Sequence, residues 1–472
     1  MRKYSKRLSG YQNTTNWRNF QNDLNQQRGT RPNARPNPRS IGRPNKRRIG
    51  RKICALASLV ICGIFGIKVL VSNSMATSPT AMTQTSAPPR ELPKITNKQD
   101  IRDLLDKQDF ENLTEKNLEL LVNEQILQIE TSLDEDLQNY LLSKMDRKNS
   151  RDIGIVVMEA DTGRILAMAG FDKTGNAGNP CLRSNFPAAS IFKIVTAASA
   201  VDHCNYNADS TMHFNGYKHT LYKRQLTDQI NKHTNTVSFK DAFAQSINPV
   251  FGKIGENRLG KSLLEKYADT FKFNEPLDFD LSLPPSHFKV NDDPYDWAEM
   301  ASGFNRDTTI SPLHGAVMAS AVLNGGRMVA PSLVDRISDD KGTVLYHGQQ
   351  TWEQQAMSAR ASTVLDQMMQ TTIKSGTARK SFSGYQKDKI LSQLQIGGKT
   401  GSMDNNTHEV RYDWFVGFAN ERHGQAKVVV SVMVAHEKFI GIRAGQYARM
   451  AITHYFSKLL AKAKDEQAIQ KI

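Results

Sequence analysis

Cysteine is scarce in this sequence, and the two commonest zinc-binding patterns are missing. Four cysteines occur among 472 residues, with neither a C-x-x-C pair nor an H-E-x-x-H segment. A zinc site is therefore not expected, and no other motif calls for a metal or a cofactor. Cys54 and Cys62 lie in an apolar run, whereas Cys181 and Cys204 come after it. The later two are predicted either to form a disulfide in an oxidising compartment or to remain two buried thiols.

Acidic residues are nearly absent from the first 52 positions, which hold 15 lysines and arginines and the single acid Asp23. This segment therefore carries almost all of the formal net charge of +15, and the rest of the chain is close to neutral. A nucleic-acid-binding protein is not favoured, because the basic charge does not extend into the remaining sequence. Residues 1–52 are rich in Arg, Asn and Pro and lack apolar periodicity, which predicts a disordered cytoplasmic tail.

One apolar run, residues 53–72, is long enough to cross a membrane. It contains a single charge, Lys68, and 20 residues of helix at about 1.5 Å each span roughly 30 Å, the thickness of a bilayer core. The basic tail would stay in the cytoplasm, which places everything after this helix outside the cytoplasmic membrane or in a periplasm. A signal peptide cleaved near Ser74-Met75-Ala76 is the alternative, disfavoured by the long leading segment. A Ser/Thr/Pro linker is expected over 73–93.

The rest of the sequence alternates between helical and strand-like patterns. Residues 94–127 are predicted to form a small helical stalk, with helical patterns at 112–127 and 133–145. Residues 153–170 alternate and turn at Asp161-Thr162-Gly163, which predicts a hairpin. Late in the chain come strand-like runs at 391–403, 412–420 and 426–436 and an amphipathic helix at 445–463, before a C-terminal tail at 464–472. Strands at both ends with helices between them predict an α+β body with a helical insert.

A serine and a lysine interrupt the apolar stretch SNFPAASIFKIVTAASAV at residues 184–201. Ser190 and Lys193 are three apart, so they share one face of a helix. Pro187 suits the first turn, which places Ser190 near a helix N-terminus, where the dipole favours developing negative charge. The apolar neighbours of Lys193 would lower its pKa and leave a neutral amine able to take the serine proton. The pattern predicts nucleophilic acyl transfer.

This S-x-x-K pattern is weak evidence by itself, because further copies begin at Ser286 and Ser338 in polar, turn-like surroundings. A second motif, Ser246-Ile247-Asn248, ends a helical pattern and offers a hydroxyl for proton relay and an amide that can bind a substrate amide.

A third motif, Lys399-Thr400-Gly401, follows a strand-like run and continues into Ser402. A cation and hydroxyls on an edge strand, with glycine allowing close approach, suit a substrate carboxylate. The other KTG copy, at Lys173, lies in a loop-like segment.

In order and rough spacing, these three motifs resemble those of penicillin-binding proteins and serine β-lactamases. The resemblance covers roughly residues 128–463 and includes flanking stretches such as SGTA and DWFVGFA. It implies a transpeptidase-like α+β fold, with an antiparallel sheet flanked by helices and a helical subdomain. It also implies that the substrate is the D-alanyl-D-alanine end of a peptidoglycan stem peptide, that β-lactams inhibit, and that other cell-wall synthesis proteins are partners.

Carried over residue by residue, the resemblance also implies roles for the site residues. Ser190 would be the nucleophile, Lys193 its base, Ser246 a proton relay, Asn248 a ligand of the substrate amide, and Lys399 and Thr400, with Gly401, the binding site of the terminal carboxylate. The backbone N–H groups of Ser190 and Ser402 would form the oxyanion hole, where one donor typically contributes about 10²–10³ in rate.

Several alternatives remain open. A D,D-carboxypeptidase would pass the acyl group to water instead of to an amine. A class A β-lactamase needs a glutamate in an E-x-x-x-N arrangement, which does not occur between Ser190 and Lys399, and class D enzymes have a small hydrophobic residue in place of Asn248. A β-lactam sensor or a non-catalytic cell-wall-binding scaffold would keep the pocket without turnover. Residues 73–127 are too few for a glycosyltransferase domain, which predicts a monofunctional transpeptidase.

Overall fold

The computed structural model describes residues 94–105, 110, 112–175 and 178–469, all within one compact unit. The predicted tail (1–52), apolar run (53–72) and linker (73–93) lie outside the described residues. Within the described ranges, no helix combines the length and the apolar character that a membrane crossing requires.

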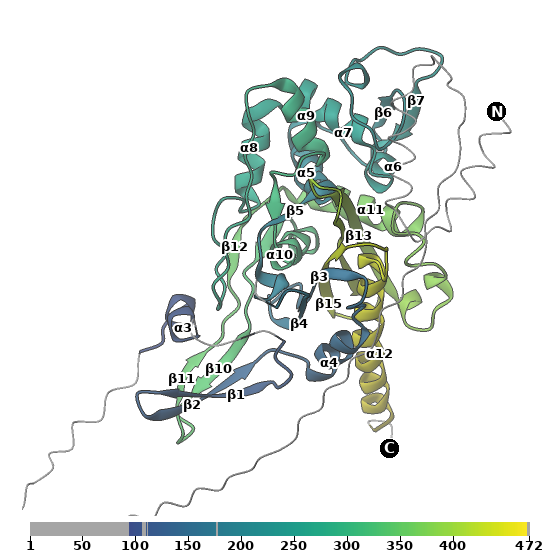
Figure 1. The fold of residues 1–472 in the computed structure, drawn as a ribbon. Coiled ribbons are helices and arrows are strands. Elements are labelled where there is room, and N and C mark those ends of the chain that lie inside the picture. The colour runs from purple at the N-terminus through teal and green to yellow at the C-terminus, as the bar shows by residue number, and fades with distance from the viewer. Residues whose placement is uncertain (1–93, 106–109, 111, 176–177, 470–472) are drawn as a thin grey trace, which may run out of the picture. The chain divides into compact units, whose positions relative to one another are not determined.

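A five-stranded antiparallel sheet forms the centre of this unit, in the order β13-β14-β15-β3-β4 (Figure 1). Its strands are β3 (Ser150–Glu159), β4 (Ile165–Asp172), β13 (Leu394–Asp404), β14 (Arg411–Glu421) and β15 (Lys427–His436). The predicted hairpin is confirmed as β3 and β4, with Gly163 at φ +77° in the turn, a conformation that favours glycine. The three late strands are confirmed too. Because β15 pairs with β3, strands from the beginning and the end of residues 128–463 lie side by side in one sheet.

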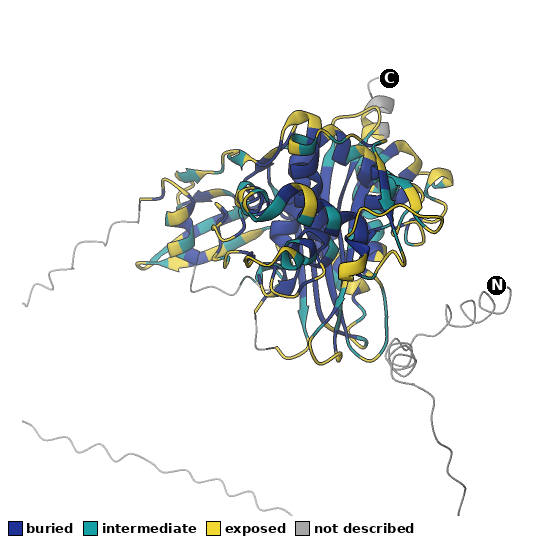
Figure 2. Ribbon diagram, turned by 90° about the horizontal axis from the view of Figure 1, so that it is seen from above, coloured by how far each residue is buried: buried dark blue, intermediate teal, exposed yellow. Residues whose placement is uncertain are grey.

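Both faces of the sheet are buried, because its side chains alternate between two apolar cores. Along β3, Ile153, Ile155 and Val157 belong to one core, whereas Val156 and Met158 belong to the other. The first core is covered by α4 (Glu135–Lys144) and α12 (Ala444–Ile469), and the second by α10 (Pro312–Leu323). In Figure 2 the strands of this sheet are largely buried. The predicted helices at 133–145 and 445–463 are confirmed as α4 and α12.

The segment between β4 and β13 supplies the predicted helical insert. Its helices are η2 (Ala189–Phe192), α5 (Lys193–Cys204), α6 (Phe239–Ala244), α7 (Asn248–Ile254), α8 (Gly260–Thr270), α9 (Pro294–Ser302) and α11 (Ala359–Lys374). Its short strand pairs are β5 (Phe186–Pro187) with β8 (Thr309–Ile310), β6 (Thr211–Phe214) with β7 (Asn235–Ser238), and β9 (Arg327–Val329) with β12 (Trp352–Gln355). Helix α5 lies in the middle of this group and contacts α7, α8, α9 and α11. Its first nine residues are all buried.

The predicted helical stalk is only partly helical. Helix α3 (Lys98–Leu105) is present, but β1 (Asn117–Val122) and β2 (Gln125–Thr131) are strands, so the helix expected at 112–127 is wrong. The strands turn at Asn123 and Glu124, whose positive φ angles of 49° and 70° suit a two-residue hairpin. The hairpin pairs with β10 (Val334–Ser338), which pairs in turn with β11 (Val344–His347). This partner strand lies far along the chain, and the local sequence does not reveal it.

Of the two alternatives for the later cysteines, the structure excludes the disulfide. Cys181 lies in the turn η1 (Pro180–Leu182), with its Sγ 3.3 Å from the carbonyl O of Ala169 in the sheet. Cys204 is the last residue of α5, a helix about 18 Å long. The helix therefore carries Cys204 away from its own N-terminal end, while Cys181 stays packed against the sheet.

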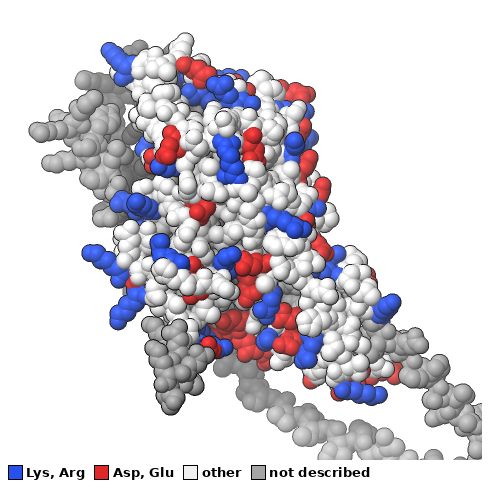
Figure 3. All heavy atoms as spheres, turned by 180° about the vertical axis from the view of Figure 1, so that it is seen from behind, with Lys and Arg blue, Asp and Glu red and all other residues white. Residues whose placement is uncertain are grey.

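Charged side chains of both signs are mixed on the surface of this unit. On the face shown in Figure 3, lysines and arginines lie among aspartates and glutamates rather than in one continuous basic area. Elsewhere in the unit, ion pairs join different elements, such as that between Arg164 and Asp335 at 2.7 Å. This face therefore offers no extended basic surface of the kind that a nucleic-acid backbone requires.

Candidate active site

Ser190 lies at the start of a helix, where the sequence predicted it. It belongs to η2, which leads directly into α5, and its side chain is partly exposed although Ile191 beside it is fully buried. The preceding residue, Ala189, has φ +48°, a strained backbone conformation for a residue with a Cβ. Gly303, directly after α9, makes room for this turn, because a Cβ at Gly303 would lie 2.0 Å from the carbonyl O of Ala189. The position of Ser190 therefore depends on a neighbouring segment as well as on its own helix.

Lys193 is completely buried and lies among three oxygen atoms. Its Nζ is 2.9 Å from Ser190 Oγ and 2.8 Å from Asn248 Oδ1, and it also contacts the carbonyl O of Ser302. Burial, together with the nearby charge of Lys399, lowers the pKa of Lys193 well below its usual value. A neutral amine has two N–H groups and one lone pair. The amide and carbonyl oxygens can only accept, so they take both N–H groups, and the lone pair is left facing the Ser190 hydroxyl.

The Ser246-Ile247-Asn248 segment joins α6 to α7 and brings a second hydroxyl into the site. Ser246 has φ +54°, and its Oγ accepts a hydrogen bond from Lys399 Nζ at 3.0 Å. Asn248 is held at both ends of its amide: Oδ1 accepts from Lys193, and Nδ2 donates to the carbonyl O of His219 at 3.2 Å. The Ser246-Ile247-Asn248 motif therefore contacts both other motifs, Lys399 through Ser246 and Lys193 through Asn248.

Lys399 and Thr400 lie on β13, which is the edge strand of the five-stranded sheet, as predicted. Lys399 is completely buried, and this burial lowers its pKa to about 7. Thr400 Oγ1 lies 2.5 Å from the Oγ1 of Thr377, which comes from the turn after α11. A cation and two hydroxyls are thus gathered at one end of the site.

Gly401 and Ser402 continue β13 past the turn that carries Ser190. A Cβ at Gly401 would lie 3.3 Å from the carbonyl O of Ala188, so a residue without a side chain lets the strand approach this turn closely. Ser402 Oγ donates a hydrogen bond to Asp413 on the neighbouring strand at 3.3 Å. The backbone of Ser402 is therefore held beside η2.

The remaining copies of the short motifs have other partners. Ser286 is buried, with its Oγ 2.6 Å from His314 Nδ1. Ser338 belongs to β10, and Lys173 forms a surface ion pair with Glu437. Among the described residues, no cluster of three or more His, Cys, Asp or Glu side chains could hold a metal ion. Of all the copies, the structure brings together only the three motifs that the sequence singled out.

A family model for the penicillin-binding protein transpeptidase domain matches residues 153–458. This range contains all three motifs and includes residues from every strand of the five-stranded sheet. The chain belongs to the penicillin-binding protein transpeptidase family.

Relatives and solved structures agree with this membership. Penicillin-binding protein 4 of Bacillus subtilis is 25% identical over 325 residues, which cover 66% of this chain and 46% of that protein. The peptidoglycan D,D-transpeptidase PbpA of Mycobacterium tuberculosis is 24% identical over 319 residues, covering 59% and 61%. This chain thus spans about half the length of the curated relatives that it matches.

Two solved structures share the fold. The D,D-transpeptidase domain of a peptidoglycan glycosyltransferase from Eggerthella lenta has a TM-score of 0.57 at 22% identity, covering 70% of this chain and 83% of that one. The ceftriaxone acyl-enzyme complex of penicillin-binding protein A from M. tuberculosis has a TM-score of 0.56 at 20% identity, covering 70% and 79%. At this level of identity the likeness concerns the fold of the penicillin-binding transpeptidase domain.

Sequence reasoning missed four residues at the site of this penicillin-binding transpeptidase domain. They are Thr377, which contacts Thr400, Ser302, which contacts Lys193 through its carbonyl, Gly303, which makes room for Ala189, and His219, whose carbonyl orients Asn248. Only Thr377 carried a signal, since it lies in the SGTA stretch. The others act through backbone atoms or through the absence of a side chain, which a search for reactive residue types does not detect.

Proposed function

We propose that this protein is a membrane-anchored peptidoglycan D,D-transpeptidase that forms an acyl-enzyme on Ser190 and is inhibited by penicillin. The observation that carries the proposal is the position of the buried Lys193 Nζ, which lies 2.9 Å from Ser190 Oγ and within hydrogen-bond distance of Asn248 Oδ1 and the carbonyl O of Ser302. A buried neutral amine in this position is suited to take the serine proton. Membership of the penicillin-binding protein transpeptidase family supports the class of substrate, a D-alanyl-D-alanine stem peptide.

In the acylation step, Ser190 Oγ attacks the carbonyl carbon of the penultimate D-alanine while its proton passes to Lys193. The new C–O bond forms, the C–N bond to the terminal D-alanine breaks, and the departing nitrogen takes up a proton. We assign this transfer to Ser246, because its Oγ is hydrogen-bonded to Lys399 Nζ and Asn248 in the same motif is hydrogen-bonded to Lys193. The backbone N–H groups of Ser190 and Ser402 would stabilise the oxyanion.

Binding of the substrate is assigned to the residues around this centre. The terminal carboxylate would lie against Thr400 and Thr377 near Lys399, and both hydroxyls could donate to it once it replaces the hydrogen bond between them. The Nδ2 of Asn248 would bind the amide of the stem peptide. These contacts hold the scissile bond against Ser190, and such positioning supplies a large share of the rate.

The competing functions differ in what happens to the acyl-enzyme. A β-lactamase needs a base that activates water, and the E-x-x-x-N arrangement that supplies this base in class A enzymes does not occur between Ser190 and Lys399. A D,D-carboxypeptidase has the same acylation step, and the acceptor alone separates it from a transpeptidase.

Incubation of the protein with a synthetic stem pentapeptide is expected to release D-alanine, and an added amine acceptor is expected to yield the cross-linked product. Mass spectrometry of the products measures both. Hydrolysed tetrapeptide alone, with every amine tried, would assign a carboxypeptidase instead. A folded protein that penicillin labels but that releases no D-alanine would be a sensor or a scaffold.

The pKa of Lys399 leads to a prediction of pH dependence. With a pKa of about 7, Lys399 is charged below this pH and neutral above it, so its attraction for a carboxylate weakens as the pH rises through 7. We expect the second-order rate of acylation by a penicillin with a free carboxylate to fall above about pH 7. The methyl ester of the same penicillin should lack this decline, and Lys399→Arg, which stays charged, should remove it. An equal decline with the ester would contradict the assignment.

The membrane anchor remains part of this proposal, supported by the composition of residues 53–72 and the basic charge before them. The catalytic domain would then lie outside the cytoplasmic membrane, where peptidoglycan is assembled. A reporter that needs export should function when fused after residue 472 and fail when fused before residue 1. The opposite result would exclude this orientation.

A further inference from the structure

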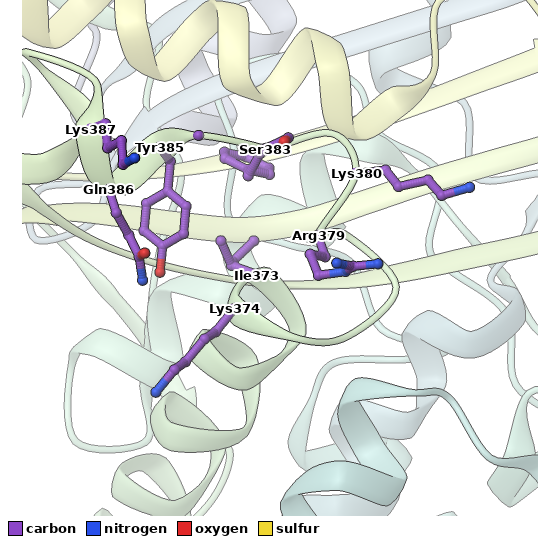
Figure 4. Close-up of a pocket in the computed structure, with 10 residues that line it drawn as sticks. Ile373, Lys374, Arg379, Lys380, Ser383, Tyr385, Gln386 and Lys387 are labelled. Carbon is purple, nitrogen blue, oxygen red and sulfur yellow. The ribbon is translucent and has the colours of Figure 1, made fainter.

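Apart from the candidate active site, a pocket of about 460 Å³ lies beyond the end of α11 and is lined mainly by residues 379–387 (Figure 4). Four of its lining residues are basic: Lys374, Arg379, Lys380 and Lys387. Ser383, Tyr385 and Gln386 add polar groups, and no acidic residue lines the pocket. In Figure 4 the basic side chains are spread around Ile373 and Tyr385 rather than gathered at one point. The pocket is therefore a concave surface of one charge sign, which we call the basic pocket.

No described residue forms an ion pair with the basic side chains of this pocket. All four of these side chains are exposed. The only acid between residues 374 and 389 is Asp388, and it has other partners. Its Oδ1 accepts from the backbone N–H groups of Ile390 and Leu391, and Arg449 lies 3.6 Å from its Oδ2. An anion that enters the pocket would meet four uncompensated cations.

The basic pocket begins next to the end of the active site that binds the carboxylate in the proposed function. Arg379 is two residues after Thr377, a separation of at most about 7 Å along an extended backbone. Thr377 in turn contacts Thr400 on β13. The segment from Thr377 to Ser383 is held at both ends, because the backbone N–H of Thr377 donates to the carbonyl O of Ala244 at 3.0 Å and Arg449 donates to the carbonyl O of Ser383 at 2.7 Å. The two sites are thus adjacent along a segment that is anchored to the rest of the unit.

The basic pocket lies on the side of the active site from which the acceptor, the second substrate of a transpeptidase, would approach. In acylation the terminal D-alanine lies toward Thr400, so its departure empties that side. An acceptor amine must approach the acyl carbon from the place of the leaving amine, because the second step reverses the geometry of the first. The rest of the acceptor molecule then extends past Thr400 and Thr377, toward the basic pocket.

We propose that the basic pocket binds carboxylate groups of the acceptor peptide and so directs the acyl group to an amine rather than to water; this inference rests on the proposed function. In the step concerned, the acceptor nitrogen bonds to the acyl carbon and the ester C–O bond to Ser190 breaks. One proton leaves the nitrogen and one returns to Ser190 Oγ, so no further reactant is needed. Carboxylates held by lysine and arginine would raise the local concentration of the amine.

The test uses the double variant Lys374→Gln/Arg379→Gln in the full chain, with Lys389→Gln as the matched control. Lys389 is exposed in the same segment but does not line the pocket. A donor stem peptide is supplied with an amine that the unsubstituted protein accepts, carried either on an acidic tripeptide or on the same tripeptide with its carboxylates amidated. The ratio of cross-linked to hydrolysed product is measured at low and at high salt. Fluorescent penicillin reports acylation separately.

With the acidic acceptor, we expect the double variant to lower the ratio about three- to tenfold, since two exposed charge contacts are lost. The difference should shrink at high salt. The amidated acceptor and the Lys389→Gln control should show no change, and penicillin labelling should keep its rate because it precedes acceptor binding. An equal loss with the amidated acceptor would overturn the proposal. Slower release of D-alanine from the donor by the double variant would also overturn it, because the pocket would then bind the donor strand. An unsubstituted protein that hydrolyses the donor but accepts no amine would overturn it as well. Failure of penicillin labelling in the unsubstituted protein would instead refute the proposed function itself.

Discussion

Ser190→Ala is expected to abolish covalent labelling by fluorescent penicillin. The label on the unsubstituted protein should survive denaturation and map to the peptide containing Ser190, because the acyl group is held by an ester bond to its Oγ. Lys193→Ala should slow labelling by about 10²- to 10⁴-fold, the usual contribution of a positioned general base. The serine would then have to lose its proton without the amine that lies 2.9 Å away.

The other S-x-x-K serines supply the controls for this experiment. Ser338→Ala should label at the normal rate, because Ser338 belongs to β10 and not to the site. Ser286→Ala should also label, although loss of the buried contact with His314 is expected to lower its stability by about 1–3 kcal/mol. Lys173→Ala should label normally, in contrast to a Lys399→Ala variant. Persistent labelling of Ser190→Ala would refute the assignment, and a label lost within seconds would indicate a β-lactamase.

Gly303→Ala is expected to reduce the rate of acylation at least about 100-fold without touching a reactive group. The added Cβ would lie 2.0 Å from the carbonyl O of Ala189 and 3.0 Å from the backbone N of Ser190, so the backbone at the nucleophile must move. Displacement of reacting atoms by about 1 Å can cost 10²-fold in rate. Because that N–H is also a predicted oxyanion donor, the same movement should impair transition-state stabilisation.

Gly325→Ala is the matched control for Gly303→Ala. Gly325 has φ +61°, nearly the same as the +62° of Gly303, but a Cβ at Gly325 would have no atom within 4 Å. Backbone strain should cost each variant about 1 kcal/mol of stability, visible as a lower midpoint of thermal unfolding, and Gly303→Ala should lose more because of its steric clash. Among the folded proteins, only Gly303→Ala should be labelled more slowly by penicillin. Equal labelling rates in the two folded variants would show that the contact with Ala189 does not position the serine.

Secondary structure was predictable where a local pattern matched the final environment. The β3–β4 hairpin has apolar residues on both sides of a glycine turn, which predicted the strands correctly, although the structure buries both faces where alternation predicts one. The stretch 112–127 has leucines at spacings that also fit a helix, and the sequence alone does not distinguish the two. In the folded protein, pairing of β2 with β10 favours strands over a helix in this stretch. This pairing is a non-local interaction between segments distant in sequence.

Taken alone, the sequence predicted which residues would carry the chemistry of this penicillin-binding transpeptidase domain: Ser190, Lys193, the Ser246–Asn248 segment and the residues from Lys399 onward. Reactive side chains are recognisable by type and spacing, and their apolar or polar neighbours separate them from chance copies. Only the tertiary structure decided how they act on one another. It shows that Asn248 Oδ1 and the carbonyl O of Ser302 both contact Lys193 Nζ, that Gly303 makes room for the turn before Ser190, and that Cys181 and Cys204 stay apart. These relations depend on backbone atoms and on segments distant in sequence, which come together only when the chain packs around its sheet.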